Sequence, residues 1–485
     1  MTYIVLVKLS RGELSYFDEA ALECALRLRE TSGGEVWVLT MSPERAAEPL
    51  SALTRLGVDR AILLSDRLYA GSDTAATSYI LSRAICRLVG IQNIQARNDL
   101  VIFCGRQSMD GDTAQVGPSV AARLGIPVIA NAMSVEMTEC DSAAGYTDIV
   151  CDTRTGRQQS ALPALVTVER ICRLRFPRMR SKTREIERYD NSYVGADADR
   201  CGQSGSLTKV VETFESERGR RSCVFLTPEQ LLIKLKELIA EEPVSNRCVA
   251  QSTVPLDELW AVGKATAEAV RGLAKRVRII ERLEVGEYVK LVKNEQPTAV
   301  IFPADLWGRC VAPQVASLVE AGLSADCIRL ETDGERLYMY RPALGGNVTA
   351  KIVCKSRLQM ATLRLPSESG DIVVSAGLGV RGELDKLRAF AESLGAQLGA
   401  SRGLVDAGAM PYESQIGVTG RCISPKIYIA VGISGAVQHM AAVEGARCIV
   451  GINPDRGARL YDYCDYGCTV PFEEIADIYY KYWKI

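Results

Sequence analysis

Short apolar runs alternate with amphipathic segments along most of this chain, and this alternation restricts its fold more than any other feature. Residues 2–8 (TYIVLVK) predict a buried strand, residues 18–30 predict a helix with Asp18 as its N-cap, and residues 35–40 predict the next strand. The pattern indicates parallel sheets covered by helices, an open, doubly wound α/β fold. Ligands of such folds bind at the carboxyl ends of the strands.

The length of 485 residues predicts about three domains, because a single hydrophobic core rarely grows so large. Residues 1–222 form the first predicted domain, a nucleotide-binding α/β domain that ends in a basic, polar arm. Residues 223–252 are predicted to be a linker. Residues 253–365 and 366–485 form the second and third domains, and we expect the third to be Rossmann-like.

Composition excludes several classes of function. The net charge of −1 gives no broad basic surface, so we expect no nucleic-acid partner. The 16 cysteines form no CxxC pair, which favours free thiols in a reducing cytoplasm, and the single histidine excludes multi-histidine metal sites. We expect no metal, no signal peptide and, without a run of about 18 apolar residues, no membrane insertion.

Two glycine-containing loops follow predicted strands in the first domain. The first is CGRQSMDGDTAQVGP (104–118), after which a helix is predicted to begin near Asp112 or Thr113. The second, AGSDTAATS (70–78), has the same construction. Exposed amides at a helix N-terminus attract phosphate, so the loops favour a nucleotide site. The alternative is ordinary capping by Asp73 and Asp112.

Two further loops follow strands of the third domain. SGAVQHM (434–440) places His439 where ligands bind in this fold class, although a lone histidine is more often structural. GASRGLVDAG (399–408) places Arg402 at a strand end, where it could pair with a phosphate or an electron-rich ring. The alternative for Arg402 is a surface ion pair.

The same motifs resemble those of electron-transfer flavoproteins, in the order beta subunit then alpha subunit. Residues 70–78 and 104–118, followed by SGSLTKVVETF (204–214), resemble the beta subunit. The alpha-like motifs are GRCVAPQVASLVEAGLSADC (308–327), RPALGGNVTAKIVC (341–354), QMATLR (359–364), GASRGLVDAG (399–408) and QIGVTGRCISPKIYIAVGISGAVQH (415–439). The resemblance covers nearly the whole chain and implies a fusion of the two subunits.

The resemblance implies one FAD in the C-terminal domain, with Thr419 near the N5 edge of the flavin and His439 near its N1/O2 edge. The implied FAD-binding residues are Ser401, Arg402, Ile416, Gly417, Val418, Thr419, Gly432, Ser434, Gly435, Ala436, Val437, Gln438, His439 and Asn453. It also implies an adenine nucleotide, a second FAD or AMP, in the N-terminal domain. The residues implied there are Leu6, Asp73, Thr74, Asp110, Gly111, Asp112, Thr113, Ala114, Gln115, Val116 and Gly117. The run DGDTAQVG is similar to the two-FAD, electron-bifurcating type.

The chain departs from the family pattern at several positions. The loop after the first strand is short, and Ser15 stands where the family has an asparagine, so we expect slow or absent oxidation of NADH. Leu378 replaces a flavin-contacting arginine, for which Arg381 could substitute, and Val418 replaces a glutamine. A Gly-Asp pair is replaced at residues 470–471.

The resulting hypothesis is an electron carrier without catalytic residues of its own, because the flavin supplies the chemistry. Its expected partner is an acyl-CoA dehydrogenase-like flavoenzyme or another redox protein. One alternative is an NADH-oxidising, electron-bifurcating flavoprotein with two FADs. The other is an adenine-nucleotide-binding regulatory module without a redox role.

Overall fold

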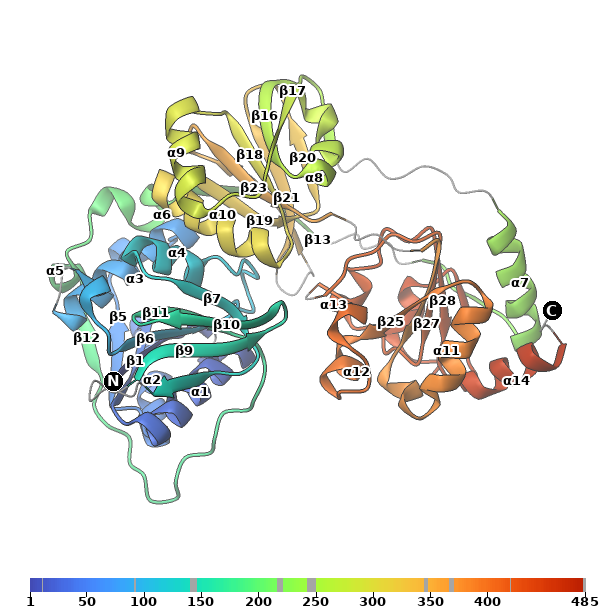
Figure 1. Cartoon of the computed structure of the whole chain (residues 1–485), viewed down its shortest axis with the longest axis horizontal. Helices are drawn as coiled ribbons and strands as arrows, with labels where there is room; N and C mark the ends of the chain where they lie inside the picture. The colour runs from blue at the N-terminus through green and yellow to red at the C-terminus, as the bar shows by residue number, and fades with distance from the viewer. Residues whose placement is uncertain are drawn as a thin grey trace. The chain divides into compact units, whose positions relative to one another are not determined.

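The computed structural model describes residues 1–10, 12–90, 93–139, 146–215, 221–241, 250–343, 348–365, 370–418 and 420–482 (Figure 1). The chain divides into two compact units. Unit 1 comprises Met1–Thr213, Val249–Leu344 and Ala350–Leu363, and unit 2 comprises Phe214–Cys248, Gly345–Thr349 and Arg364–Ile485. Both contain parallel sheets covered by helices, so the predicted fold class is confirmed.

The first sheet of unit 1 has the strand order β10-β9-β7-β11-β6-β1-β4-β5-β12, with β8 beside β9. Its strands are β1 (Thr2–Leu6), β4 (Glu35–Met41), β5 (Arg60–Leu64), β6 (Leu100–Gly105), β7 (Val128–Ala132), β8 (Glu136–Glu139), β9 (Tyr146–Thr153), β10 (Gly156–Ala161), β11 (Ala164–Val168) and β12 (Glu187–Tyr189). Seven neighbouring strands of this sheet are parallel: β7, β11, β6, β1, β4, β5 and β12. Strand β9 pairs antiparallel with β7 at the edge of this parallel part. The helices are α1 (Tyr16–Ser32), α2 (Ala47–Leu53), α3 (Thr74–Val89) and α4 (Val116–Leu124).

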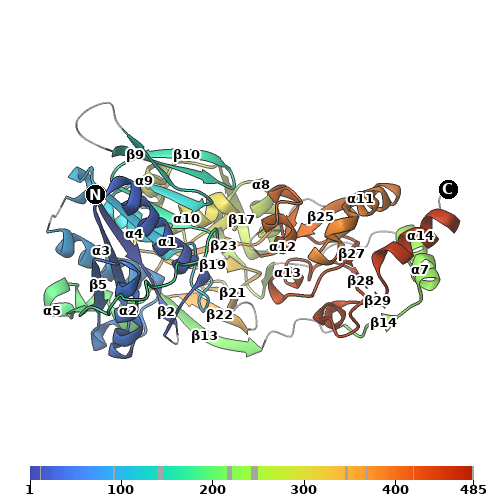
Figure 2. The same cartoon turned by 90° about the horizontal axis from the view of Figure 1, so that it is seen from below.

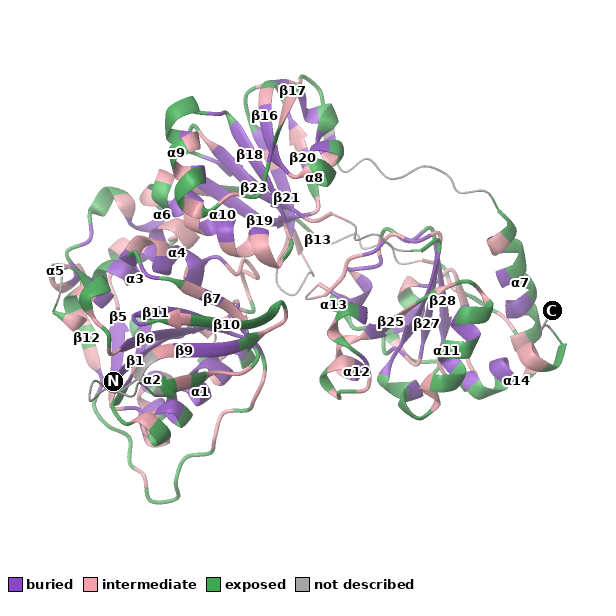
Figure 3. Ribbon diagram, in the orientation of Figure 1, coloured by how far each residue is buried: buried purple, intermediate pink, exposed green. Residues whose placement is uncertain are grey.

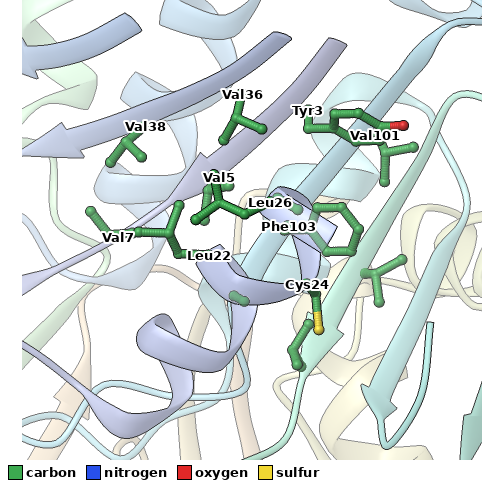
Figure 4. Packing of buried hydrophobic residues seen from close by; sticks show 14 of the residues in the cluster. Tyr3, Val5, Val7, Leu22, Cys24, Leu26, Val36, Val38, Val101 and Phe103 are labelled. Carbon is green, nitrogen blue, oxygen red and sulfur yellow. The ribbon is translucent and has the colours of Figure 1, made fainter. Parts of the chain in front are cut away.

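Alternate residues of β1 face opposite sides of this sheet. Tyr3 and Val5 pack on Leu22 and Leu26 of α1 (Figure 4). Ile4 and Leu6 belong to the core on the other face, which α3 and α4 cover. Because both faces are covered, the central strands are apolar throughout. Helix α1 begins one turn earlier than predicted: Ser15 is its N-cap and accepts from the Asp18 amide at 3.0 Å, so Asp18 lies in the first turn.

Unit 1 contains two more sheets. The parallel one has the order β17-β16-β18-β23-β19 and packs with α8 (Lys264–Ala269), α9 (Val285–Glu295) and α10 (Leu306–Val319). Its strands are β16 (Leu256–Val262), β17 (Ala274–Ile280), β18 (Ala299–Pro303), β19 (Gly322–Cys327) and β23 (Gln359–Leu363). The mixed one has the order β13-β22-β21-β20-β15. Its strands are β13 (Thr208–Glu215), β15 (Ala250–Ser252), β20 (Arg329–Thr332), β21 (Leu337–Ala343) and β22 (Val348–Cys354).

Part of the predicted arm is ordered by pairing with folded segments. Within it, β12 extends the first sheet beside β5, α5 (Asn191–Val194) and α6 (Gly202–Gly205) follow, and β13 pairs with β22. A two-strand hairpin, β2 (Leu9–Ser10) and β3 (Glu13–Leu14), precedes α1. The basic cluster predicted at residues 173–184 contains exposed side chains such as Phe176 and Met179.

Unit 2 is built on one parallel sheet with the order β14-β29-β28-β27-β24-β25-β26. Its strands are β14 (Val224–Phe225), β24 (Ile372–Ala376), β25 (Gln397–Ser401), β26 (Gln415–Ile416), β27 (Ile427–Val431), β28 (Cys448–Ile452) and β29 (Tyr466–Cys468). The helices are α7 (Pro228–Ala240), α11 (Leu384–Ser393), α12 (Arg402–Asp406), α13 (Val437–Met440) and α14 (Phe472–Tyr482). Strands β27 and β28 are buried along their length (Figure 3).

Two elements of unit 2 lie within residues 223–252, the predicted linker. Strand β14 pairs with β29, and α7 buries Leu231, Leu232 and Leu235 in the core of unit 2. Helices α7 and α14 lie side by side in both views (Figures 1 and 2). Residues 223–241 are therefore an integral part of unit 2, because their apolar side chains complete its core.

Candidate nucleotide and flavin sites

Unit 1 contains a cavity of about 820 Å³ at the carboxyl edge of its first sheet. Strands β1, β4, β5 and β6 contribute Leu6, Leu39, Leu64 and Cys104 at their ends, and residues 65–74 and 104–117 complete most of the wall. A cavity of roughly 300–1,000 Å³ is typical of sites for small ligands and cofactors. Its place at the strand ends is the one expected for this fold class.

The loop before α4 differs from its predicted form. Helix α4 begins at Val116 rather than near Asp112, because Asp112 and Ala114 have φ angles of 51° and 55°, which no right-handed helix accommodates. Asp112 accepts from Gln107 Nε2 at 3.0 Å and is not a helix cap. Left-handed backbone at residues other than glycine is strained, and such strain occurs most often at ligand sites.

Most of the residues predicted for the N-terminal nucleotide line this cavity. They are Leu6, Asp73, Thr74, Gly111, Thr113, Ala114, Gln115, Val116 and Gly117, whereas Asp110 and Asp112 are outside the lining. A Cβ atom at Gly117 would come within 2.7 Å of the sulfur of Cys104 and of the Thr167 side chain. The close packing of α4 on β6 and β11 therefore depends on glycine at this position.

Two of these lining residues are held by protein partners. Asp73 caps α3 through a 3.0 Å bond from the Ala76 amide, and its second oxygen accepts from the amide and hydroxyl of Thr208, both at 2.8 Å. Gln115 accepts from the Thr74 hydroxyl and donates to the Leu323 carbonyl at 3.2 Å. Asp73 thus caps α3 and anchors β13, and its contact with a nucleotide stays a prediction.

Two charged residues of the cavity wall were missed by the sequence analysis. Burial raises the pKa of the Asp18 carboxyl to about 6, although hydrogen bonds from the Lys8 and Gly105 amides and from Ser15 act in the opposite direction. Arg106 follows β6 and forms a 2.7 Å ion pair with Glu169, and both side chains are almost fully buried. Asp18 was missed because it is one of several polar residues at the start of a predicted helix. Arg106 was missed because its partner, Glu169, lies 63 residues later in the sequence.

The residues predicted to bind FAD lie at the carboxyl ends of four strands of unit 2, in the run β28-β27-β24-β25-β26. Ser401 ends β25, Ile416 ends β26, Gly432 follows β27 and Asn453 follows β28. Because all five strands of this run are parallel, these loops lie at the same edge of the sheet. Arg402 begins α12, while Ser434, Gly435, Ala436, Val437, Gln438 and His439 form the turn and helix after β27. Thr419 lies outside the described residues.

Backbone contacts hold these loops together. Gly417 has a φ of 154°, and the Val418 amide donates to the Gln438 carbonyl at 3.0 Å, which joins the β26 loop to α13. The Asn453 side chain donates to the Ile433 carbonyl at 2.9 Å. Gly435 has a φ of 82°, and a Cβ atom there would lie 2.1 Å from the Leu460 amide nitrogen. Any larger residue at 435 would displace the 459–460 backbone from this edge.

Arg402 and His439 are the two ionisable side chains of the predicted flavin set. Arg402 forms a 3.1 Å ion pair with Asp406 and is about one quarter exposed, so the surface-pair alternative describes its contact here. His439 is buried, and its Nε2 lies 2.6 Å from the Tyr428 hydroxyl. Burial lowers the pKa of His439 to about 4, while the Ile416 backbone acts weakly in the other direction. The imidazole is therefore neutral at pH 7.

Two features of this edge bear on ligand binding. His439 is buried beside the Ile416 backbone, with which its ring forms a hydrogen bond that acts to raise the pKa of the imidazole. A Cβ atom at Gly377, Gly432 or Gly435 would clash with neighbouring backbone, so the loops pack closely against one another here. Loops at the carboxyl ends of parallel strands are where ligands bind in this fold class.

Comparison with known proteins decides the family. Residues 4–193 and 288–368 match the family described as the electron transfer flavoprotein domain, and residues 367–444 match the electron transfer flavoprotein FAD-binding domain. The chain belongs to the electron transfer flavoprotein family. It combines a beta-like and an alpha-like part in one polypeptide, as predicted.

Relatives match each part of this flavoprotein separately. The electron transfer flavoprotein subunit beta of Megasphaera elsdenii is 39% identical over 210 residues, which are 41% of this chain and 74% of that protein. The subunit alpha of the same organism is 33% identical over 242 residues, 39% of this chain and 72% of that protein. Protein FixA of Bradyrhizobium diazoefficiens is 37% identical over 221 residues, 44% of this chain and 75% of that protein.

Over the described ranges, no three histidine, cysteine, aspartate or glutamate side chains are grouped so that they could hold a metal ion. Nor does any helix among the described residues combine the length and apolar character needed to cross a bilayer.

Proposed function

We propose that this flavoprotein carries electrons through FAD between a partner dehydrogenase, of the acyl-CoA dehydrogenase type, and a second redox protein. The observation that carries the proposal is the match of residues 367–444 to the FAD-binding domain, in which Arg402 and the buried His439 lie in loops at the strand ends. Bound FAD would accept and release the electrons, and the protein would set its orientation and potential. The scattered cysteines without a CxxC pair support a cytoplasmic location.

Each part of the C-terminal edge has a distinct task in this proposal. The turn at Gly432 and Gly435 brings backbone amides close to the cofactor. The neutral imidazole of His439 offers a hydrogen bond rather than a charge. Arg402 keeps a permanent positive charge near the edge, partly balanced by Asp406. Asn453 holds the Ile433 carbonyl and thereby fixes the turn.

We assign residues 1–222 to the beta-like part, residues 253–365 to the first alpha-like domain and residues 366–485 to the FAD domain. The cavity of unit 1 is the proposed second nucleotide site. The wall of this cavity runs from Gly111–Gly117, past the ends of β1, β4 and β5, to Ser65 and Asp66. This extent supports a dinucleotide such as FAD over AMP, in agreement with the motif DGDTAQVG.

The cofactor content is expected to be two FAD molecules per chain. The protein is purified without added nucleotide, the ligands are released by acid, and chromatography separates FAD from AMP. One FAD and one AMP would assign the cavity to AMP, and a colourless preparation that binds only adenine nucleotides would favour the regulatory-module alternative. In a Gly117→Val variant the added side chain would push α4 away from β6 and β11, so this variant is expected to lose the N-terminal nucleotide and retain the C-terminal FAD.

Reduction by NADH is expected to be slow or absent. Among the described residues between β1 and α1, the regular structure is the short β2-β3 hairpin, and the family resemblance implies a longer loop here. The holoprotein is mixed with stoichiometric NADH without oxygen, and flavin absorbance is followed in a stopped-flow instrument, with dithionite as the control. Complete bleaching within the first second would instead favour the NADH-oxidising, bifurcating alternative.

A further inference from the structure

Two cysteines that are far apart in the sequence meet beside α1 in unit 1. Cys24 lies in the middle of α1, is 7% exposed and belongs to the apolar core on this face of the first sheet (Figure 4). Cys172 lies in the irregular segment between β11 and β12 and is half-buried. Both thiols are free, and both residues belong to the same compact unit. Their contact is therefore part of the fold of unit 1.

Two sets of contacts fix the segment around Cys172 against one turn of α1. The Cys172 sulfur lies 3.9 Å from the Ala20 carbonyl oxygen, which in an α-helix accepts from the amide of Cys24. Arg175 donates from its amide and from its Nε to Glu23 Oε2, at 3.1 and 3.0 Å. The two thiols consequently lie in contact, and they share a hydrogen bond.

The two thiols differ in reactivity. The hydrogen bond from the Cys24 thiol lowers the pKa of Cys172; burial acts against this effect, and the positive charge of Arg27 assists it. The same hydrogen bond, together with burial, raises the pKa of Cys24, so the proton stays there. The thiolate is the form of cysteine that attacks oxidants. Cys172, which is also the more exposed of the two, is therefore the attacking sulfur, and Cys24 is the resolving one.

We propose that Cys24 and Cys172 form a redox-active thiol pair, which hydrogen peroxide closes to a disulfide and a dithiol reductant opens again. The pair needs neither a nucleotide nor a flavin, so the proposal stands independently of the proposed function. A reducing environment keeps the two thiols open. Under oxidising conditions the disulfide fixes the residue that precedes the basic cluster 173–184 to α1.

The reaction balances in two steps. The Cys172 thiolate attacks one oxygen of hydrogen peroxide: an S–O bond forms, the O–O bond breaks, and the hydroxide that leaves takes up the proton of the Cys172 thiol to become water. The Cys24 sulfur then attacks the Cys172 sulfur: the S–S bond forms, the S–O bond breaks, and the oxygen leaves with the Cys24 proton as a second water. The sulfurs must approach to about 2.05 Å. The irregular segment that carries Cys172 supplies this movement.

Peptide mapping of the holoprotein tests the proposal without any variant. The protein is treated with stoichiometric hydrogen peroxide, the remaining thiols are alkylated, and the digest is analysed by mass spectrometry. The expected product is a pair of peptides joined through Cys24 and Cys172, which a dithiol reductant separates. A cross-link from Cys24 to Cys151, the third thiol of this neighbourhood, would overturn the proposal. So would oxidation of Cys172 to sulfinic acid without any cross-link.

Serine variants test the role of each sulfur. Cys24→Ser is expected to stop at the sulfenic acid of Cys172, which dimedone traps, whereas Cys172→Ser is expected to form neither product. The matched control is Cys86→Ser, which removes a half-buried thiol of α3 whose pKa is raised by burial. This control is expected to keep the cross-link. Dimedone labelling of Cys172 no faster than that of Cys86, or loss of the cross-link in Cys86→Ser, would contradict the assigned roles.

Closure of the pair is expected to restrain the start of the arm. Hydrogen exchange of peptides covering residues 170–184 is expected to be slower in the oxidised than in the reduced protein, and the urea midpoint is expected to rise, because a disulfide constrains the unfolded chain. Equal exchange in the two forms would show that the disulfide does not hold the arm. The FAD content is measured in parallel: its absence would refute the proposed function, whereas the cross-link alone decides the thiol pair.

Discussion

Replacing Glu169 with glutamine is expected to lower the free energy of unfolding of unit 1 by about 3–5 kcal/mol. Glu169 Oε1 lies 2.7 Å from Arg106 Nη1 and 3.4 Å from Arg154 Nε. The side chains are 1%, 2% and 3% exposed in the order Glu169, Arg106 and Arg154. Neutralising the carboxylate leaves two buried guanidinium groups without their shared counter-charge, and uncompensated buried charge is strongly destabilising.

The matched control is Glu136→Gln. Glu136 pairs with Arg157 at 3.3 Å, but both side chains are about two thirds exposed, so its loss is expected to change stability by less than about 1 kcal/mol. Urea unfolding gives the total effect, and hydrogen exchange of peptides covering β6 and β11 assigns it to unit 1. Equal urea midpoints for Glu169→Gln and Glu136→Gln would contradict this expectation, and would indicate that water reaches the Glu169–Arg106–Arg154 cluster.

The stability of unit 2 is expected to fall as the pH is lowered from about 6.5 to about 4. His439 has a pKa of about 4 in the folded protein and 6.5 as the unperturbed value, so the unfolded chain binds the proton first. Proton uptake by the unfolded state lowers stability with falling pH. Over this whole pH range, the free energy of unfolding is expected to fall by about 3 kcal/mol, because a pKa difference of one unit corresponds to about 1.36 kcal/mol. This pH dependence is expected to be absent in His439→Gln.

Asp18 produces the opposite dependence in unit 1. Its pKa is raised from 3.8 to about 6, so its contribution is present below about pH 3.8 and is lost as the pH rises through about 6. The two windows overlap, and the whole-chain unfolding curve of the wild type would hide both. Hydrogen exchange of peptides from β27 and from β1, compared between the wild type, His439→Gln and Asp18→Asn, separates them. If hydrogen exchange in β27 depends on pH in the same way in the wild type and in His439→Gln, the expectation for His439 is contradicted.

The architecture was predictable because it follows from local patterns. Apolar runs such as 2–6 and 427–431 are buried on both faces of their sheets, as local hydrophobicity predicts. Gly432 directly follows the second run and marks the turn at the carboxyl edge. The predicted flavin residues therefore meet at one edge although they span 401–453. This follows from parallel strand order, in which loops far apart in sequence become neighbours.

The remaining features depend on contacts that no local pattern encodes. Strand β14 has only two residues, and its partner β29 lies some 240 positions later, so residues 223–252 were predicted to be a linker. Arg106 and Glu169 meet because β6 and β11 are neighbouring strands. In β27, Tyr428 occupies an ordinary core position, and only the fold shows that His439 covers it.

The pairing of β13 with β22 has a consequence for synthesis on the ribosome. Residues 208–215 leave the ribosome long before residues 348–354, which supply their partner strand. At roughly 5–20 residues per second, the first strand waits on the order of 10–30 s for the second. An unpaired strand edge invites intermolecular association, which charged side chains discourage. Lys209 and Glu212 interrupt the apolar residues of this strand, so the nascent chain carries its own protection during the delay.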